Sequence, residues 1–160
     1  MAVDAFLYID GRKGPSLKRA GAIDLLSFSF GANMASSYGT GRSGSEAATG
    51  NASASDLSVM SVLDGLSPEL FRDLCSGHIY PEVKVEYEKP IGDEQTAFFK
   101  TTLEDCFLTS LQLSGSSENP MVSMSFAAEK IKVSYNPQDD EGKLQGYKDG
   151  GWDFGKQVKW

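Results

Sequence analysis

Apolar and polar residues alternate along most of the chain with a period of two residues. This period is typical of strands that bury one face and expose the other to water. It predicts strands at 5–9, 23–30, 57–63, 83–88, 97–113 with a bend, and 121–135, and a further strand near 152–160. We therefore expect a mainly β architecture.

The second predicted strand shows the alternation most clearly. Leu26, Phe28 and Phe30 fall on one of its faces. The small hydroxyl residues Ser27 and Ser29 fall on the other face. We expect the apolar face to pack in the core and the two serines to face water.

One segment carries the signals of a helix. Ser67 is a favourable N-cap, Pro68 fits the first helical position, and Gly77 fits the left-handed position that ends a helix. The stripe expected to be buried consists of Leu70, Phe71 and Leu74.

Residues 36–55 consist almost wholly of Gly, Ala, Ser and Thr. Such a composition buries little surface and does not repay the entropy of ordering, so it predicts a long, mobile loop that orders against a partner. Gly39, Gly41 and Gly44 match the spacing of a dinucleotide-binding fingerprint. No amphipathic helix follows them, so we interpret the match as chance.

Length and charge narrow the possible functions. The 160 residues, 40% of them hydrophobic, fit one domain spanning 1–160. The formal net charge of −7 leaves no basic face for nucleic acid or anionic membranes, so we expect neither as a partner. No signal peptide or membrane-spanning segment is expected from the apolar runs.

Candidates for metal binding and catalysis are few. His78 is the only histidine, and its place after the helix end favours a structural role. Cys75 and Cys106 are the only cysteines, and with His78 they lack the ligand spacing that zinc requires. We interpret both as small buried residues and consider a disulfide between them the minor alternative. No catalytic residue, metal or cofactor is expected.

Several segments carry a family resemblance. They are MAVDAFLYI at 1–9, IDLLSFSFG at 23–31, SPEL at 67–70, CSGHIYP at 75–81 and GWD at 151–153. In these motifs the chain resembles the haemolysin-coregulated protein (Hcp) family, which forms the inner tube of bacterial type VI secretion systems. The resemblance spans nearly the whole chain and is weakest at 88–95 and 136–150.

The resemblance implies a fold and an assembly. The fold is two packed antiparallel sheets that form a small barrel with one flanking helix, related to phage tail tube proteins. The assembly is a hexameric ring that stacks into a tube, carries small effector proteins in its lumen, and meets a spike protein and sheath proteins. The protein is expected in the bacterial cytoplasm before firing and then in the exterior or target cell, exported without a signal peptide. No catalysis is implied.

The resemblance also gives residue roles. Ser27 and Ser29 are expected to line the lumen and contact cargo, and facing bulk solvent is their alternative role. Arg42 is expected to pair with a carboxylate on the adjoining ring, because it is the only cation in the predicted loop. The residues expected in the ring-stacking loop are Tyr38, Gly39, Gly41, Arg42 and Gly44.

Other functions stay open at this point. A tube protein of a phage tail or another contractile injection system shares the implied architecture. A monomeric β-sandwich that binds a small ligand through Tyr38, Trp152 or Trp160 is less favoured. A hydrolase requires that His78 be activated by a carboxylate in a pocket.

Overall fold

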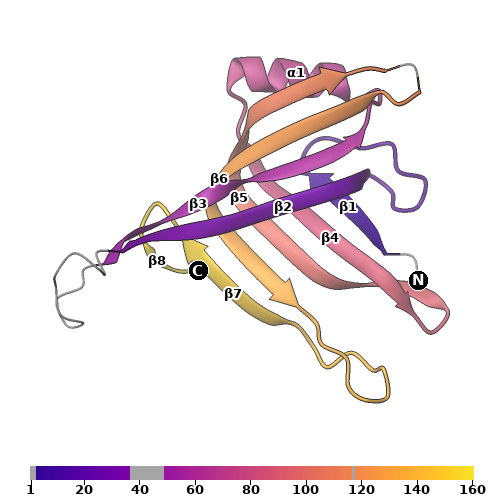
Figure 1. Cartoon of the computed structure of the whole chain (residues 1–160), viewed down its shortest axis with the longest axis vertical. Coiled ribbons are helices and arrows are strands. Elements are labelled where there is room, and N and C mark those ends of the chain that lie inside the picture. Colours follow the sequence, from indigo (N-terminus) through magenta and orange to yellow (C-terminus); the bar gives the residue numbers. More distant parts are fainter. Residues whose placement is uncertain (1–2, 37–48, 117) are drawn as a thin grey trace.

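The computed structural model describes residues 3–36, 49–116 and 118–160 (Figure 1). Within them it has one helix and eight strands, which confirms the mainly β architecture. The elements are β1 (Asp4–Ile9), β2 (Ile23–Ser36), β3 (Thr49–Val62), α1 (Ser67–Ser76), β4 (Tyr80–Ile91), β5 (Glu94–Ser114), β6 (Met121–Tyr135), β7 (Lys148–Asp153) and β8 (Val158–Lys159).

The strands form one antiparallel sheet that closes on itself. Their order is β3-β2-β1-β4-β5-β6-β7-β8, and a further pairing of β3 with β6 completes a barrel. Two packed layers share the long strands β5 and β6 (Figure 1). The front layer is β2-β3-β6-β5, and the back layer is β1-β4-β5-β6-β7. The expected barrel of two antiparallel layers with one flanking helix is therefore confirmed.

The core lies between these two layers. Leu7, Leu57, Val83, Leu103 and Phe126 are each 0% exposed and come from five different strands. Burying one such side chain stabilises the fold by roughly 1.5–3 kcal/mol. The predicted bend of β5 coincides with Asp105, whose φ is 52°, where the strand passes from the back layer to the front.

β2 confirms the predicted strand but not all of its faces. Leu25 is buried, whereas Leu26 is 59% exposed, so the prediction for Leu26 is wrong. The cause is a bulge, because the pairing with β3 shifts between Leu25 and Ser27. After the shift, Phe28 and Phe30 pack against the core as predicted.

The prediction of a loop over residues 36–55 is wrong in its last part. β3 begins at Thr49, and residues 49–55 pair with 31–36 of β2. Backbone hydrogen bonds hold such a ladder whatever the side chains, so small residues suffice once the partner strand is present. These two strand ends form a hairpin arm that extends beyond the barrel (Figure 1). Residues 37–48 lie outside the described residues.

α1 has nearly the predicted ends. Its N-cap is Leu66 and not the predicted Ser67. No side chain of the described residues caps the start of the helix with a hydrogen bond. Asp64 instead stabilises the turn before the helix, because its carboxylate accepts the N–H of Leu66 at 2.9 Å. Gly77 follows with φ of 69°, the left-handed conformation predicted for the helix end.

The buried stripe of α1 is rotated from the predicted one. Leu70 is buried and Leu74 packs against the core, but Phe71 is 55% exposed. Asp73 is buried in its place, because its carboxylate is held by partners in the barrel. Tertiary contacts of one polar residue therefore set the rotation of the helix.

Two further predictions need correction. Cys106 is buried as predicted, but Cys75 is exposed, and both thiols are free. The predicted strand at 152–160 is the end of β7 followed by a turn and the short β8. Gln157 in that turn has φ of 56°, a left-handed conformation that interrupts a strand.

Candidate functional site

A row of hydroxyl groups crosses the outward surface of the front layer. Ser29 of β2 lies opposite Ser58 of β3, and Ser58 lies opposite Ser125 of β6. Ser125 in turn lies opposite Ser110 of β5. Because paired residues of antiparallel strands project from the same face, these four residues form one line, which we call the serine row. The hydroxyl oxygens of Ser58 and Ser125 are 3.3 Å apart.

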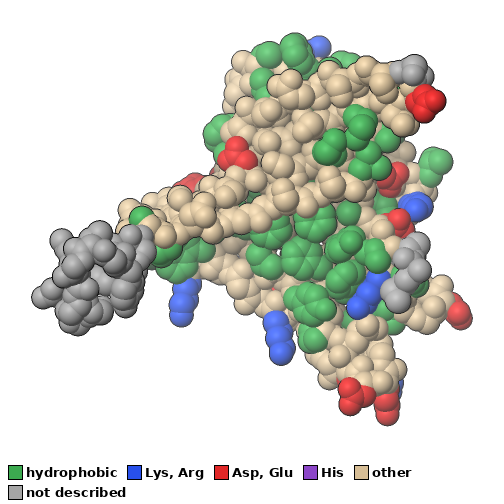
Figure 2. All heavy atoms as spheres, viewed as in Figure 1, with side chains coloured by type: hydrophobic (Ala, Val, Ile, Leu, Met, Phe, Trp, Pro, Cys, Tyr) green, Lys and Arg blue, Asp and Glu red, His purple; other side chains and the backbone are tan. Residues whose placement is uncertain are grey.

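A second row runs beside the first and is also uncharged. It contains Ser27, Met60, Ser123 and Gln112, paired in the same strand order. At the margin, the carboxylate of Asp56 accepts a hydrogen bond from the Thr109 hydroxyl at 2.7 Å. Over β3, β5 and β6 the surface in Figure 2 is mainly tan, with a group of hydrophobic side chains toward its right end and charged side chains at its edges. The front layer therefore presents a neutral, hydroxyl-rich surface.

Ser27 and Ser29 lie on this surface and are both exposed, as the alternation predicted. Their contact with cargo stays a prediction. Sequence reasoning missed Ser58, Ser110 and Ser125, although Ser58 and Ser125 stand in alternating segments that mark them as outward-facing. These serines are aligned by pairing between strands that are far apart in sequence, and the alternation within one strand does not predict that pairing.

The residues predicted for ring stacking are not placed by the structure. They lie outside the described residues and are Tyr38, Gly39, Gly41, Arg42 and Gly44.

The front layer ends in an open edge on each side. Within the described residues, β1 pairs with β2 only at Ile23, Asp24 and Leu25, so residues 26–36 have no strand on that side. β4 pairs with β5 only as far as Cys106, so residues 107–114 have none on theirs. Unpaired strand edges recruit other strands unless a neighbour covers them.

The other candidate residues have structural surroundings. The His78 ring packs at 5.0 Å from the Tyr80 ring, and its backbone N–H donates to the Asp73 carbonyl at 2.9 Å. Trp152 and Trp160 both line a groove beneath β2. Within the part of the chain that the structure describes, no three His, Cys, Asp or Glu side chains gather as a set of metal ligands.

Two ion pairs, each formed by a buried carboxylate and a partly exposed arginine, hold the β1–β2 connection against the barrel. The Arg12 guanidinium donates two hydrogen bonds to Asp73, each of 2.9 Å, and Arg19 binds the buried Glu88 in the same way. The hydrogen bonds from Arg12 hold the pKa of the Asp73 carboxyl below its ordinary value. These charges neutralise one another and so serve the fold.

Comparison with known proteins identifies the family of this chain. A family model described as "Type VI secretion system effector, Hcp" matches residues 6–135. The chain belongs to the Hcp family. Hcp relatives cover its full length: protein hcp1 of Pseudomonas aeruginosa is 33% identical over 172 residues, which span 99% of each chain.

Solved structures of Hcp proteins share the fold. One described as a type six secretion system protein superposes with a TM-score of 0.88 at 28% identity, covering 99% of this chain and 100% of that one. Hcp1 from Salmonella typhimurium has a TM-score of 0.79 at 25% identity and covers 100% of both chains. The Hcp family consists of structural, secreted proteins of the type VI secretion system and is not a known enzyme family. Among the described residues, no helix has the length and apolar character for crossing a membrane.

Proposed function

We propose that this chain forms hexameric rings that stack into the inner tube of a type VI secretion system and carry small effectors in the lumen. The observation that carries this proposal is the front layer, a four-strand surface with a neutral, hydroxyl-rich outer side and an open edge at each end. Family membership supports it.

The two open edges explain why copies join side by side. When residues 26–36 of one copy lie beside residues 107–114 of the next, both unpaired edges are covered. This contact joins different surfaces of the two copies, so each copy keeps a free edge of the other kind. Repetition then continues until the ring closes, and the front layers become a continuous wall.

The contrast between the layers indicates which one faces the lumen. The outer side of the back layer carries cross-strand charges, such as Lys100 with Glu86 at 3.9 Å and Lys130 with Glu104 at 3.9 Å. The serine row offers hydroxyl groups without net charge. A neutral polar wall holds water and binds passing proteins weakly, which suits a channel. The charged layer then faces outward, toward the sheath.

Sedimentation and negative-stain electron microscopy of the purified protein test the ring. We expect particles with six-fold symmetry and a central hole. Single subunits at every concentration, together with images that lack rings, contradict the proposal. A tube of a phage tail or another contractile injection system has the same appearance, and the neighbouring genes distinguish it.

Ser29→Trp tests the lumen surface. The substitution is expected to leave rings intact and to reduce the amount of cognate effector that elutes with them in size exclusion. Glu82→Trp, on the exposed outer side of β4, is the matched control and should change neither property. Effector retention equal to wild type removes Ser29 from the lumen.

Arg42→Glu tests stacking. Reversal of this charge is expected to leave single rings and to prevent long stacks in electron micrographs, because an attraction to a carboxylate becomes a repulsion. Arg42→Lys keeps the charge and should stack. Normal stacks of the Arg42→Glu protein contradict the pairing.

A further inference from the structure

The barrel is closed on one side by α1 and open on the other. Beneath β2, the front and back layers separate, and a groove of about 750 Å³ lies between them. Figure 2 shows a broad group of hydrophobic side chains there, below the β2 strand. The residues that the argument uses are Phe30 on β2, Val133 on β6, and Gly150 and Trp152 on β7.

Half-buried aromatic rings continue the apolar surface from the groove along β4 and β5. The Phe30 and Phe99 rings lie 6.3 Å apart, and the Phe28 ring lies 6.1 Å from Phe99. Tyr87 packs against Phe28 at 5.5 Å and against Phe98 at 5.3 Å. A contiguous apolar surface of this kind on a folded chain marks an interaction site.

The groove also contains a polar group without a partner. The Trp152 indole nitrogen is buried and has no hydrogen-bond acceptor among the described residues. A buried N–H in that state costs about 1–3 kcal/mol. The groove is lined mainly by apolar side chains and the rest of the Trp152 ring, so it suits an occupant that brings an apolar side chain.

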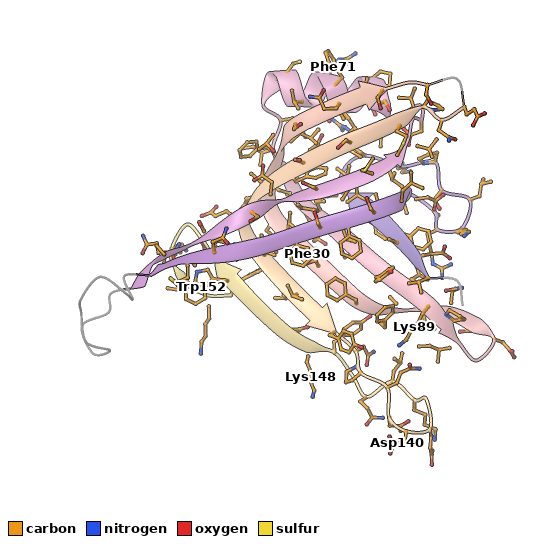
Figure 3. All side chains as sticks on the ribbon, in the orientation of Figure 1. Phe30, Phe71, Lys89, Asp140, Lys148 and Trp152 are labelled. Carbon is orange, nitrogen blue, oxygen red and sulfur yellow. The ribbon has the colours of Figure 1, made fainter. Side chains whose placement is uncertain are left out.

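The opposite side of the molecule exposes apolar side chains. Phe71 of α1 is 55% exposed, Ile79 is 60% exposed, and Phe107 of β5 is 42% exposed. Phe71 lies on α1 at the top of the molecule in Figure 3, whereas Phe30 and Trp152 lie below it, near β2 and β7. α1 packs against β5, the strand with the second open edge.

We propose that the groove beneath β2 receives α1 of a second copy of this chain, with Phe71 inserted between Phe30, Val133 and Trp152. This inference rests on the proposed ring, because pairing the β2 edge with the next copy's β5 edge brings the α1 that packs on β5 next to the groove. The groove and the helix become two halves of one contact behind the wall of the lumen.

The face of α1 that carries Phe71 fits the same occupant. Pro68 and Cys75, which lie three and four positions from Phe71 on that face, are exposed and uncharged. An apolar groove therefore covers this face of the helix without burying a charge.

Two single variants and a control test the contact by sedimentation over a concentration series. Phe71→Arg alters an exposed residue of α1. Gly150→Arg fills the groove, because Gly150 lies opposite Val133 and a Cβ there meets nothing within 4 Å. Each is expected to raise the concentration of half-assembly at least about tenfold, as loss of a central interface residue does. Leu17→Arg, at a fully exposed apolar residue on the β1–β2 connection, should assemble like wild type.

Mixing the two variants distinguishes this contact from general damage. A Phe71→Arg copy keeps an intact groove, and a Gly150→Arg copy keeps an intact α1. The mixture is therefore expected to form pairs that neither variant forms alone, and these pairs should not extend into rings. If the mixture stays as single subunits while both variants keep native circular dichroism, the proposal is overturned.

Tryptophan fluorescence reports occupancy of the groove directly, because the chain's two tryptophans, Trp152 and Trp160, both line it. In wild type, quenching by acrylamide is expected to fall at least about twofold between dilute subunits and rings, as the second copy covers them. Rings with unchanged quenching overturn the groove contact and leave the proposed function standing. Two other results also overturn the groove contact and leave the proposed function standing. One is low quenching in dilute subunits, which indicates that another occupant covers the tryptophans. The other is quenching in Phe71→Arg rings as low as in wild-type rings. Failure of wild type to form rings overturns the proposed function itself.

Discussion

Asp73 joins α1 to the barrel through three hydrogen bonds. Its carboxylate accepts two from Arg12, each of 2.9 Å, and one from the Tyr80 hydroxyl at 2.6 Å. The side chain is only 7% exposed, so its charge depends on these partners. Removing one partner of a buried pair leaves the other charge uncompensated, which costs roughly 3–5 kcal/mol.

This network predicts a loss of stability in acid. The hydrogen bonds from Arg12 lower the pKa of Asp73 in the folded state from the ordinary 3.8. A lowered folded pKa contributes stability that is present above the ordinary pKa and is lost as pH falls through the folded pKa. Urea unfolding at pH 7 and pH 3 should therefore show a smaller pH effect in Asp73→Asn than in wild type, and lower stability of the variant at pH 7.

Glu69→Gln is the matched control for this prediction, because Glu69 is an exposed carboxylate on the same helix. It should keep the acid effect of wild type. An Asp73→Asn protein with the full acid effect shows that other carboxylates cause it.

The two thiols should differ in reactivity. Cys106 is fully buried, and burial raises the pKa of its thiol to about 12, so almost none is ionised at neutral pH. Cys75 is exposed. Ellman's reagent is expected to titrate one thiol in the folded protein and two after unfolding. Cys75→Ser should leave none in the folded protein, and a rapid reaction of that variant contradicts the burial of Cys106.

At the scale of residues, the sequence predicts which residue types are buried, but it does not predict the contacts that bury or expose a particular residue. It is right for Phe28, Phe30 and Cys106, and wrong for Leu26, Phe71 and Cys75. A bulge turned Leu26 outward, and the anchoring of Asp73 rotated Phe71 away from the barrel. Both causes involve a partner distant in sequence, which alternation and composition do not include.

At the scale of elements, the hairpin arm is held partway along its length by a side chain. The Gln157 amide donates to the Ala52 carbonyl and accepts from the Ala52 N–H, each at 2.9 Å. This arrangement imitates a strand pairing on the free edge of β3. The turn before β8 therefore binds the arm on the edge of β3 that has no neighbouring strand among the described residues.

Gln157→Gly tests this attachment. Glycine adopts the φ of 56° without strain, so the substitution keeps this backbone conformation while it removes the amide, together with the 2.8 Å hydrogen bond that the amide donates to the Phe154 carbonyl. We expect hydrogen exchange at the Ala52 amide to become at least about tenfold faster, because that N–H loses its acceptor. Gln145→Gly, at an exposed glutamine on the β6–β7 connection, is the control. Unchanged exchange at Ala52 contradicts the clamp.

The strands themselves were predictable where one face is apolar, as in β1, β4 and β6. The arm was not, because the apolar face of residues 49–55 consists only of Ala52 and Ala54, and the segment forms a strand through backbone pairing with the distant β2. The helix was predictable from Pro68 and Gly77, whose backbone preferences act locally. Elements that depend on pairing between distant segments could be identified only from the structure.

At the scale of the whole molecule, the pairing of β3 with β6 creates the candidate site. It closes the barrel and also aligns Ser58 with Ser125, so one contact produces both the fold and the serine row. Sequence reasoning found Ser27 and Ser29 on a polar face, and the family resemblance supplied the assembly. The groove beneath β2 and the open edges appear only once the layers are assembled.

Salt should distinguish the two kinds of contact in the proposed tube. Each copy carries a formal net charge of −7, and assembly brings six such charges together. The contacts proposed within a ring are backbone pairings and apolar packing, which salt does not screen, whereas the repulsion between copies is screened within about 8 Å at physiological ionic strength. Rings are therefore expected to form at lower protein concentration as sodium chloride rises.

Stacking through Arg42 should respond in the opposite direction. An exposed pairing of one cation with a carboxylate weakens as salt screens it. Sedimentation across a sodium chloride series should show stacks giving way to single rings, while rings persist against single subunits. Rings that dissociate with rising salt contradict an apolar contact in the groove, and stacks that lengthen contradict the role of Arg42.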